Sequence, residues 1–129
     1  MAHFLNGRLV KGVSTSIALD RPTCHVITRE HGVLLVTLSE LKALFFVKDL
    51  DGKRTYRDHQ VIGATDRRAT GPKRLYITFR DGEQIVALAP TYDGARQFFY
   101  ALPADPNSNN IRILVNRTAV ASVVVLPAA

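Results

Sequence analysis

The sequence reads FLNGRLVKGV from Phe4 to Val13 and FRDGEQIVAL from Phe79 to Leu88. Both stretches place an Asx-Gly pair between apolar residues, and such a pair supplies the positive φ angles that a tight β-hairpin requires. From Leu75 to Arg80 apolar side chains alternate with Tyr, Thr and Arg, the period of two expected of a half-buried strand. The two stretches therefore predict hairpins in corresponding places.

The correspondence continues downstream of the hairpins. It pairs Cys24–Ile27 with Phe98–Ala101, Leu34–Val36 with Ile113–Val115, and Leu41–Val47 with Val120–Leu126. The register slips within the turn-rich segment 103–110, where loops tolerate insertions. We therefore interpret the chain as two diverged copies of one unit of about five short strands.

This repeat decides how Ser39–Phe45 should fold. Taken alone, the segment could be a capped helix. Its counterpart is a run of valines, and such runs favour strands. We expect one helical turn at most over Ser39–Leu41, followed by a strand over Ala43–Val47.

The predicted fold is all-β, with two tandem SH3-like or Sm-like barrels. The first barrel spans residues 1–50, a basic linker spans 51–72, and the second barrel spans 73–129. A single sandwich that uses all the strands is the alternative. The linker is long for a structureless loop in a compact protein, so we expect it to be partly ordered or functional.

Composition limits where the protein works and what it binds. Cys24 is the only cysteine, so no intramolecular disulfide can form, and we expect a buried thiol. The chain opens without a signal-peptide pattern, and its longest apolar run, Ala43–Val47, cannot span a bilayer. We predict a cytoplasmic protein without membrane association. The net charge of +6 favours acidic partners.

Nothing in the sequence predicts an enzyme. The histidines are scattered, and Cys24 and His25, as neighbours on a strand, should face opposite sides, so no metal site is expected. No phosphate-binding glycine loop or nucleophile elbow is present. Several carboxylates sit in turns, where they act as turn formers. We predict no catalytic residues, no metal and no cofactor.

The basic linker is the first candidate site. Its cations, with the two that follow it, are Arg57, Arg67, Arg68, Lys73 and Arg74. Arginine forks match phosphate oxygens, and the nearby Tyr56 could stack on a base. A solvated linker that only keeps the protein soluble is the alternative.

The second candidate site is the polar segment 107–112. Asn109, Asn110 and Arg112 could contact a ligand at the rim of a barrel. Asn and Ser also bond readily to nearby backbone, so a purely structural loop is the alternative.

Two segments, Leu41–Gly52 and Pro103–Ile113, resemble the recurring signatures of an uncharacterised bacterial family, and the resemblance covers nearly the whole chain. Some relatives attach such a domain to signalling or regulatory modules, which implies an adaptor or sensing role. The hairpin and the last turn also resemble Sm-like RNA-binding barrels, although the polar and aromatic positions of uridine-binding pockets are not recognisable here.

The favoured hypothesis is a non-enzymatic module that binds RNA or another nucleic acid through the linker and the barrel rim. The rival is a protein-interaction adaptor with an acidic partner, since small β units offer open edges for strand addition. The same edges would also allow a homo-oligomer. Steep weakening by salt would distinguish phosphate binding from strand addition.

Overall fold

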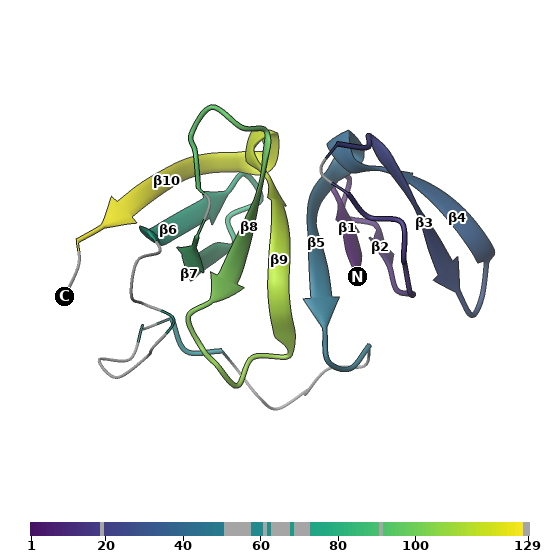
Figure 1. Cartoon of the computed structure of the whole chain (residues 1–129), viewed down its shortest axis with the longest axis horizontal. Coiled ribbons are helices and arrows are strands. Elements are labelled where there is room, and N and C mark those ends of the chain that lie inside the picture. The colour runs from purple at the N-terminus through teal and green to yellow at the C-terminus, as the bar shows by residue number, and fades with distance from the viewer. Residues whose placement is uncertain are drawn as a thin grey trace.

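The computed structural model of the chain describes residues 1–18, 20–50, 58–60, 62, 68, 73–90 and 92–127 (Figure 1). Its elements are strands and short 3-10 turns. They are β1 (Ala2–Phe4), β2 (Leu9–Val10), β3 (Thr23–Thr28), β4 (Gly32–Thr37), η1 (Leu38–Glu40), β5 (Leu41–Val47), β6 (Lys73–Phe79), β7 (Gln84–Ala89), β8 (Phe98–Pro103), β9 (Asn110–Asn116), η3 (Arg117–Ala119) and β10 (Val120–Leu126). The all-β prediction is confirmed. Within the described ranges, no helix has the length and hydropathy needed to cross a membrane.

The strands form one open sheet and one separate hairpin. The eight-stranded sheet has the order β10-β6-β7-β8-β9-β5-β1-β2, and β3 pairs with β4 alone. Figure 1 shows β10 and β4 at opposite ends of the molecule. The prediction of two closed barrels is wrong, because β5 of the first half (residues 1–50) pairs with β9 of the second half (residues 73–127).

The sequence of β5 and β9 explains this junction. β5 reads LKALFFV, apolar except for Lys42, and β9 reads NIRILVN, with a continuous apolar stretch over Ile113–Val115. A strand that is apolar on both faces requires cover on both faces. In the joined sheet, Leu41–Leu44 and Ile113–Asn116 are all buried. Pairing the two strands therefore removes apolar surface that two separate barrels would leave in water.

Gly7 and Gly82 occupy the same place in the two predicted hairpin turns. Their φ angles are +89° and +94°. In each turn the glycine N–H donates to the carbonyl of a phenylalanine three residues earlier, Phe4 or Phe79, at 3.0 Å. The prediction of two tight Asx-Gly hairpins is confirmed.

The Asx residues act differently from what the sequence predicts. Among the described residues only glycines have positive φ, so Asn6 and Asp81 do not share that role. Instead, Asn6 Oδ1 accepts a hydrogen bond from the Arg8 N–H at 2.9 Å, and Asp81 Oδ1 accepts one from the Glu83 N–H at 3.0 Å. Each turn is therefore a side-chain-braced turn closed by a glycine, as in three-residue hairpin loops.

The segment before β5 folds as expected. A single 3-10 turn, η1, covers Leu38–Glu40 and leads directly into β5. The last strand is entered in the same way, because η3 precedes β10. Both the single turn and the strand that follows it are therefore confirmed.

Two apolar clusters form the interior. One contains Leu75, Ile77 and Phe99 of the second half. The other gathers residues of the first half around Cys24, and it also contains Leu114 of β9. Cys24 is buried and His25 is exposed on the other side of β3, as predicted. Burial raises the pKa of the Cys24 thiol.

Part of the linker is ordered against the second half. The His59 N–H donates to Asp105 Oδ2 at 3.2 Å, and His59 Nε2 lies 3.2 Å from Asp105 Oδ1. Gln60 Oε1 accepts a hydrogen bond from the Val86 N–H of β7 at 2.7 Å. These described residues agree with the expectation of a partly ordered linker.

Candidate functional site

The linker cations predicted from the sequence are only partly described. Arg57 and Arg67 lie outside the described residues. Arg68 donates from its guanidinium to the Ala104 carbonyl at 3.1 Å. The ammonium group of Lys73 lies 5.6 Å from the centroid of the Tyr92 ring. Arg68 and Lys73 therefore contact different segments of the second half.

Arg74 is partly buried on β6. In the sheet register it lies between Leu88 of β7 and Leu126 of β10. Its place is therefore in the interior of a three-strand pairing rather than in the linker.

Asn109 has a structural role. Its side-chain amide donates to the Asp49 carbonyl at 2.8 Å, and its side-chain oxygen accepts a hydrogen bond from the Asp49 N–H at 3.1 Å. The neighbouring Asn110 donates its N–H to Ser108 Oγ at 3.0 Å. These contacts close the 103–110 loop onto the segment that follows β5, which favours the structural interpretation of this loop.

Arg112 lies between two aromatic rings on neighbouring strands. Its guanidinium carbon is 4.4 Å from the centroid of Phe46 on β5 and 4.6 Å from that of Tyr100 on β8. The residue itself is exposed. A guanidinium held over aromatic rings is a flat cationic surface on which a base can stack. The sequence identified Arg112, but the two rings became partners only through strand pairing.

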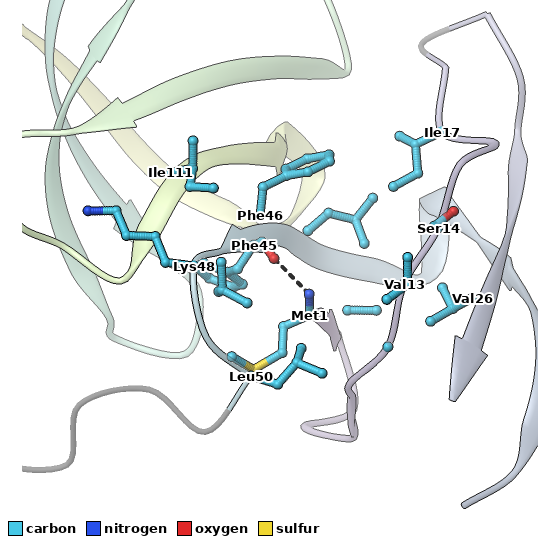
Figure 2. Close-up of a pocket in the computed structure, with 14 residues that line it drawn as sticks. Met1, Val13, Ser14, Ile17, Val26, Phe45, Phe46, Lys48, Leu50 and Ile111 are labelled. Atoms are coloured by element: carbon cyan, nitrogen blue, oxygen red, sulfur yellow. Dashed lines mark hydrogen bonds between the residues drawn. The ribbon is translucent and has the colours of Figure 1, made fainter. Parts of the chain in front are cut away.

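An apolar cleft opens beside this platform (Figure 2). Its volume is about 390 Å³, and its walls include Ile17, Phe46, Leu50 and Ile111. The Met1 nitrogen donates to the Phe45 carbonyl at 2.7 Å, which is the dashed line in Figure 2. The cleft therefore draws its apolar walls from β5, β9 and the loop between β2 and β3.

A second cleft, the basic groove, adjoins the apolar cleft. Its volume is about 780 Å³, and its lining cations are Arg8, Lys11, Arg29 and Lys48. Two carboxylates, Glu30 and Asp49, also line it. The residues Gly12, Val13, Lys48 and Leu50 line both clefts. The apolar cleft thus opens directly into a groove in which positive charge predominates.

Sequence reasoning missed these four cations. They come from three separate segments, around residues 8–11, 29 and 48, and no run of charge marks them in the sequence. Only the folding of the β3–β4 hairpin next to β2 brings them to one groove. A search for local runs of positive charge in the sequence identifies the linker but not this groove.

A third cleft, the β10 groove, borders the last strand. Its volume is about 600 Å³, and it is lined by Arg80, Arg96 and Arg117 without a carboxylate among its described lining residues. Arg80 Nε donates to the Thr118 carbonyl at 2.9 Å, and Arg117 Nη1 donates to the Gly94 carbonyl in the loop between β7 and β8. Two of the three arginines therefore brace the backbone around the groove.

Lys42 is the one fully buried cation among the described residues. Its side chain is 5% exposed, and Nζ lies 2.7 Å from Asp81 Oδ2 and 2.5 Å from Glu83 Oε1. The hydrogen bond from Lys42 lowers the pKa of Asp81. This cluster joins β5 to the β6–β7 turn, so its role is structural.

The described part of the chain contains no group of three His, Cys, Asp or Glu side chains that could hold a metal ion. The buried Asp105 is engaged with His59 and with its own loop, where Oδ1 accepts the Asn107 N–H at 2.8 Å. Asp105 therefore organises the 103–110 loop and the linker.

The family of unknown function DUF6982 matches residues 1–127, so the chain belongs to that family. This confirms the expected membership of an uncharacterised domain family. No curated protein and no solved structure shows a significant match to the chain.

Proposed function

We propose that this member of a family of unknown function is a non-enzymatic binding module for single-stranded nucleic acid, with RNA as the first candidate. One observation carries the proposal. An apolar cleft of about 390 Å³ opens directly into a groove lined by four permanent cations. A nucleotide presents the same pair of features, a flat apolar base next to an anionic phosphate.

The base-binding part is assigned to the apolar cleft and the platform at its edge. Phe46 lines the cleft, and the guanidinium of Arg112 lies over its ring. Bases stack on aromatic rings and on guanidinium planes without strong preference for sequence. We therefore expect binding to single strands with modest sequence selectivity.

The phosphate-binding part is assigned to the basic groove. Lys48 stands at the junction of the two clefts, and Arg8, Lys11 and Arg29 continue the positive charge from there. A backbone that crosses the groove would displace counterions from its phosphates. The net charge of +6 would add long-range attraction.

The test compares two variants that each lose four positive charges. The groove variant replaces Arg8, Lys11, Arg29 and Lys48 with Ala, and the linker variant replaces Arg67, Arg68, Lys73 and Arg74 with Ala. Binding to a labelled single-stranded RNA of mixed sequence is followed by fluorescence anisotropy from about 50 mM salt upward. Circular dichroism first confirms that both variants keep the native fold, since Arg68 bonds to the backbone.

The groove variant should lose at least about tenfold in affinity and should show a flatter salt dependence, by roughly one unit of slope per lost phosphate contact. The linker variant should lose less. A larger loss in the linker variant would move the site to the linker. No binding by the wild-type chain at about 50 mM salt would contradict nucleic-acid binding.

We also propose that the two halves are diverged copies of one β unit. The Leu5 N–H donates to the Glu40 carbonyl at 3.0 Å, and the Arg80 N–H donates to the Ala119 carbonyl at 2.9 Å. These two bonds tie each hairpin turn to the 3-10 turn of the same half. They support the proposal because they join equivalent positions.

The strand registers add further support. In the first half Phe4 pairs with Leu41 and Ala2 with Leu44, with an irregularity after His3. In the second half Phe79 pairs with Val120 and Ile77 with Val123, with an irregularity before Ser122. The two irregularities occupy the same step of the two pairings.

A third match concerns the bend between the second and third strands of each unit. Val13 forms an isolated bridge with Ile27, and Leu88 pairs with Leu102. This match makes Cys24 equivalent to the buried Phe99. The sequence alignment had made it equivalent to Phe98, so the two alignments differ by one residue. Burial supports the new register, since both Cys24 and Phe99 are 2% exposed.

A protein-interaction adaptor is the second candidate function. The observation that favours it is the exposed apolar face of the β3–β4 hairpin, where Ile27, Val33 and Leu35 are 56%, 61% and 63% exposed. An extended peptide could add to this hairpin as a further strand. Binding of such a peptide should change little with salt, unlike phosphate binding.

A further inference from the structure

The pairing of β5 with β9 is an interface between the two halves of one chain. Ala43 lies opposite Val115, Leu44 opposite Leu114, and Phe45 opposite Ile113. In the proposed correspondence of the halves, β10 is the counterpart of β5 and β4 is the counterpart of β9. The inference below rests on that correspondence, but not on nucleic-acid binding.

The counterparts of the two joined strands are both open. In the described part of the chain, β10 pairs only with β6, and β4 pairs only with β3. The two strands lie at opposite ends of the molecule (Figure 1). Among the described strands, β10 and β4 are therefore two different open edges, and they correspond to the two strands that pair inside the molecule.

Neither edge carries the charges or prolines that commonly protect a free strand. β4 reads GVLLVT and β10 reads VASVVVL. The irregularity of β10 lies in its pairing with β6, between Val120 and Ser122, and the internally paired β5 has a similar irregularity in its pairing with β1, so this feature does not distinguish a free edge from a paired strand. These two edges have the composition of strands that are paired.

Selected positions that are buried in the internal β5–β9 pairing have counterparts on β4 and β10 that are exposed, as expected if a partner strand is missing there. Leu114 of β9 is 2% exposed, whereas its counterpart Leu35 on β4 is 63% exposed. Ala43 of β5 is 1% exposed, whereas its counterpart Ser122 on β10 is exposed. The internal positions are covered by the other half, whereas Leu35 and Ser122 are left exposed by the described part of the chain.

The β10 groove is the empty counterpart of a filled position. Inside the chain, Leu38, Leu41, Ala43 and Leu44 line, together with Phe98, Leu114 and Asn116, a cleft with no room for a water molecule. The counterparts of the first four residues are Arg117, Val120, Ser122 and Val123, and all four line the β10 groove of about 600 Å³. Phe98, Leu114 and Asn116 correspond to Thr23, Leu35 and Thr37. These three residues of another molecule would therefore fill the β10 groove.

We propose that β10 of one molecule pairs antiparallel with β4 of a second copy, head to tail. The internal pairing sets the register. Val123 lies opposite Leu35, Ser122 opposite Val36, and Val125 opposite Val33. The interface joins two different surfaces, so each added copy leaves one β10 and one β4 free, and the series either closes into a ring or continues as a filament.

The first test measures mass in solution. Sedimentation or light scattering should give integer multiples of 14.3 kDa that increase with concentration. Leu35→Lys should weaken association at least about tenfold, because its ammonium group would be buried in a groove lined by Arg80, Arg96 and Arg117. Leu9→Lys is the matched control, since Leu9 is also exposed, at 46%, but lies on neither β4 nor β10. A wild-type chain that stays monomeric up to about 1 mM overturns the proposal.

The second test fixes the polarity and the register. Leu35→Cys and Val123→Cys chains are prepared separately, mixed, and treated with a short bismaleimide. The wild-type chain, whose only cysteine is buried, is the blank. Cross-linked pairs should form in the mixture and not in either variant alone. Cross-linking of Leu35→Cys with itself would show symmetric pairing of two β4 edges and would overturn the head-to-tail arrangement.

Both tests are independent of nucleic acid. The substituted edge residues, Leu35 and Val123, are not among the cations of the basic groove, so RNA binding can fail while association holds. Capture of an unrelated extended peptide at β4 of a monomeric chain would likewise overturn the proposal and favour the adaptor function.

Discussion

The ammonium group of Lys42 lies 2.7 Å from the carboxylate of Asp81, although the two residues belong to different halves of the chain. Lys42 is almost fully buried, while the Asp81 side chain is 49% exposed. The Phe79 ring lies 4.6 Å from the same ammonium group. The cluster therefore consists of a buried cation, Lys42, and two carboxylates, Asp81 and Glu83, that remain in contact with water.

This asymmetry predicts that the two sides of the cluster are unequal in stability. Lys42→Met should cost about 1 kcal/mol or less, because Asp81 and Glu83 can be hydrated without the cation. The double variant Asp81→Asn, Glu83→Gln should cost about 3 kcal/mol, because it leaves a buried charge without a partner. Urea denaturation measures both values. A larger loss for Lys42→Met than for the double variant would contradict this account.

The same pair makes stability depend on pH. Because the pKa of Asp81 is lowered in the folded state by the Lys42 hydrogen bond, Asp81 contributes stability above its ordinary pKa and loses that contribution as pH falls through the lowered value. The wild-type Tm should therefore fall more steeply than that of Asp81→Asn below about pH 4. Parallel Tm curves for the two proteins would exclude a pH-dependent role for this pair.

Gly82 should resist substitution because of its backbone conformation alone. Its φ is +94°, and a Cβ at this position would have open space around it. Gly82→Ala should therefore cost about 1 kcal/mol, and Gly82→Val at least as much. Gly94→Ala is the control, since Gly94 has no positive φ and its Cβ would make an ordinary 3.6 Å contact. Thermal unfolding unchanged by Gly82→Val would show that the turn has another geometry.

Asn116 should be required for the junction of the two halves. It is buried, its amide donates to the Leu41 carbonyl at 2.8 Å, and its oxygen accepts the Thr118 N–H at 3.1 Å. Asn116→Ala should destabilise the chain by about 1–3 kcal/mol, because a buried carbonyl and a helical-turn N–H lose their partners. Asn109→Ala, on an exposed clasp, should cost less in the same denaturation experiment.

Local signals were sufficient for the hairpin turns, whereas the single 3-10 turn before β5 was predicted only by comparing the two halves of the sequence. Gly7 and Gly82 lie in short apolar frames whose geometry depends on a few residues. The pairing of β5 with β9 has no such signal. An apolar run such as Leu41–Val47 predicts that both faces of the strand are buried, but it does not predict which strand pairs with it. The closed-barrel prediction failed at this point.

The functional candidates divide in the same way. Arg112 was identified because it ends a polar segment of the sequence, yet its stacking on Phe46 and Tyr100 depends on the pairing of β5, β9 and β8. The cations of the basic groove are spread over separate segments of the sequence, so no local run of charge marks them. Lys42 was missed because a lysine within a strand usually points to water.

The attachment of the β3–β4 hairpin has a consequence for the kinetics of the molecule. The hairpin forms no strand ladder with the described strands of the sheet. Its backbone is bridged to the segment after β2 at Val13–Ile27, beside Gly12, where a Cβ would lie 2.3 Å from the Ile27 carbonyl. Its inner side chains pack in the apolar cluster of the first half. A unit that is attached by packing without a ladder is expected to open before the rest of a fold. Cys24, the only thiol of the sequence, belongs to β3 and is buried in that cluster. The rate at which a thiol reagent labels Cys24 should therefore report the rate at which this hairpin opens. Pairing of β4 with β10 of a second copy should lower that labelling rate.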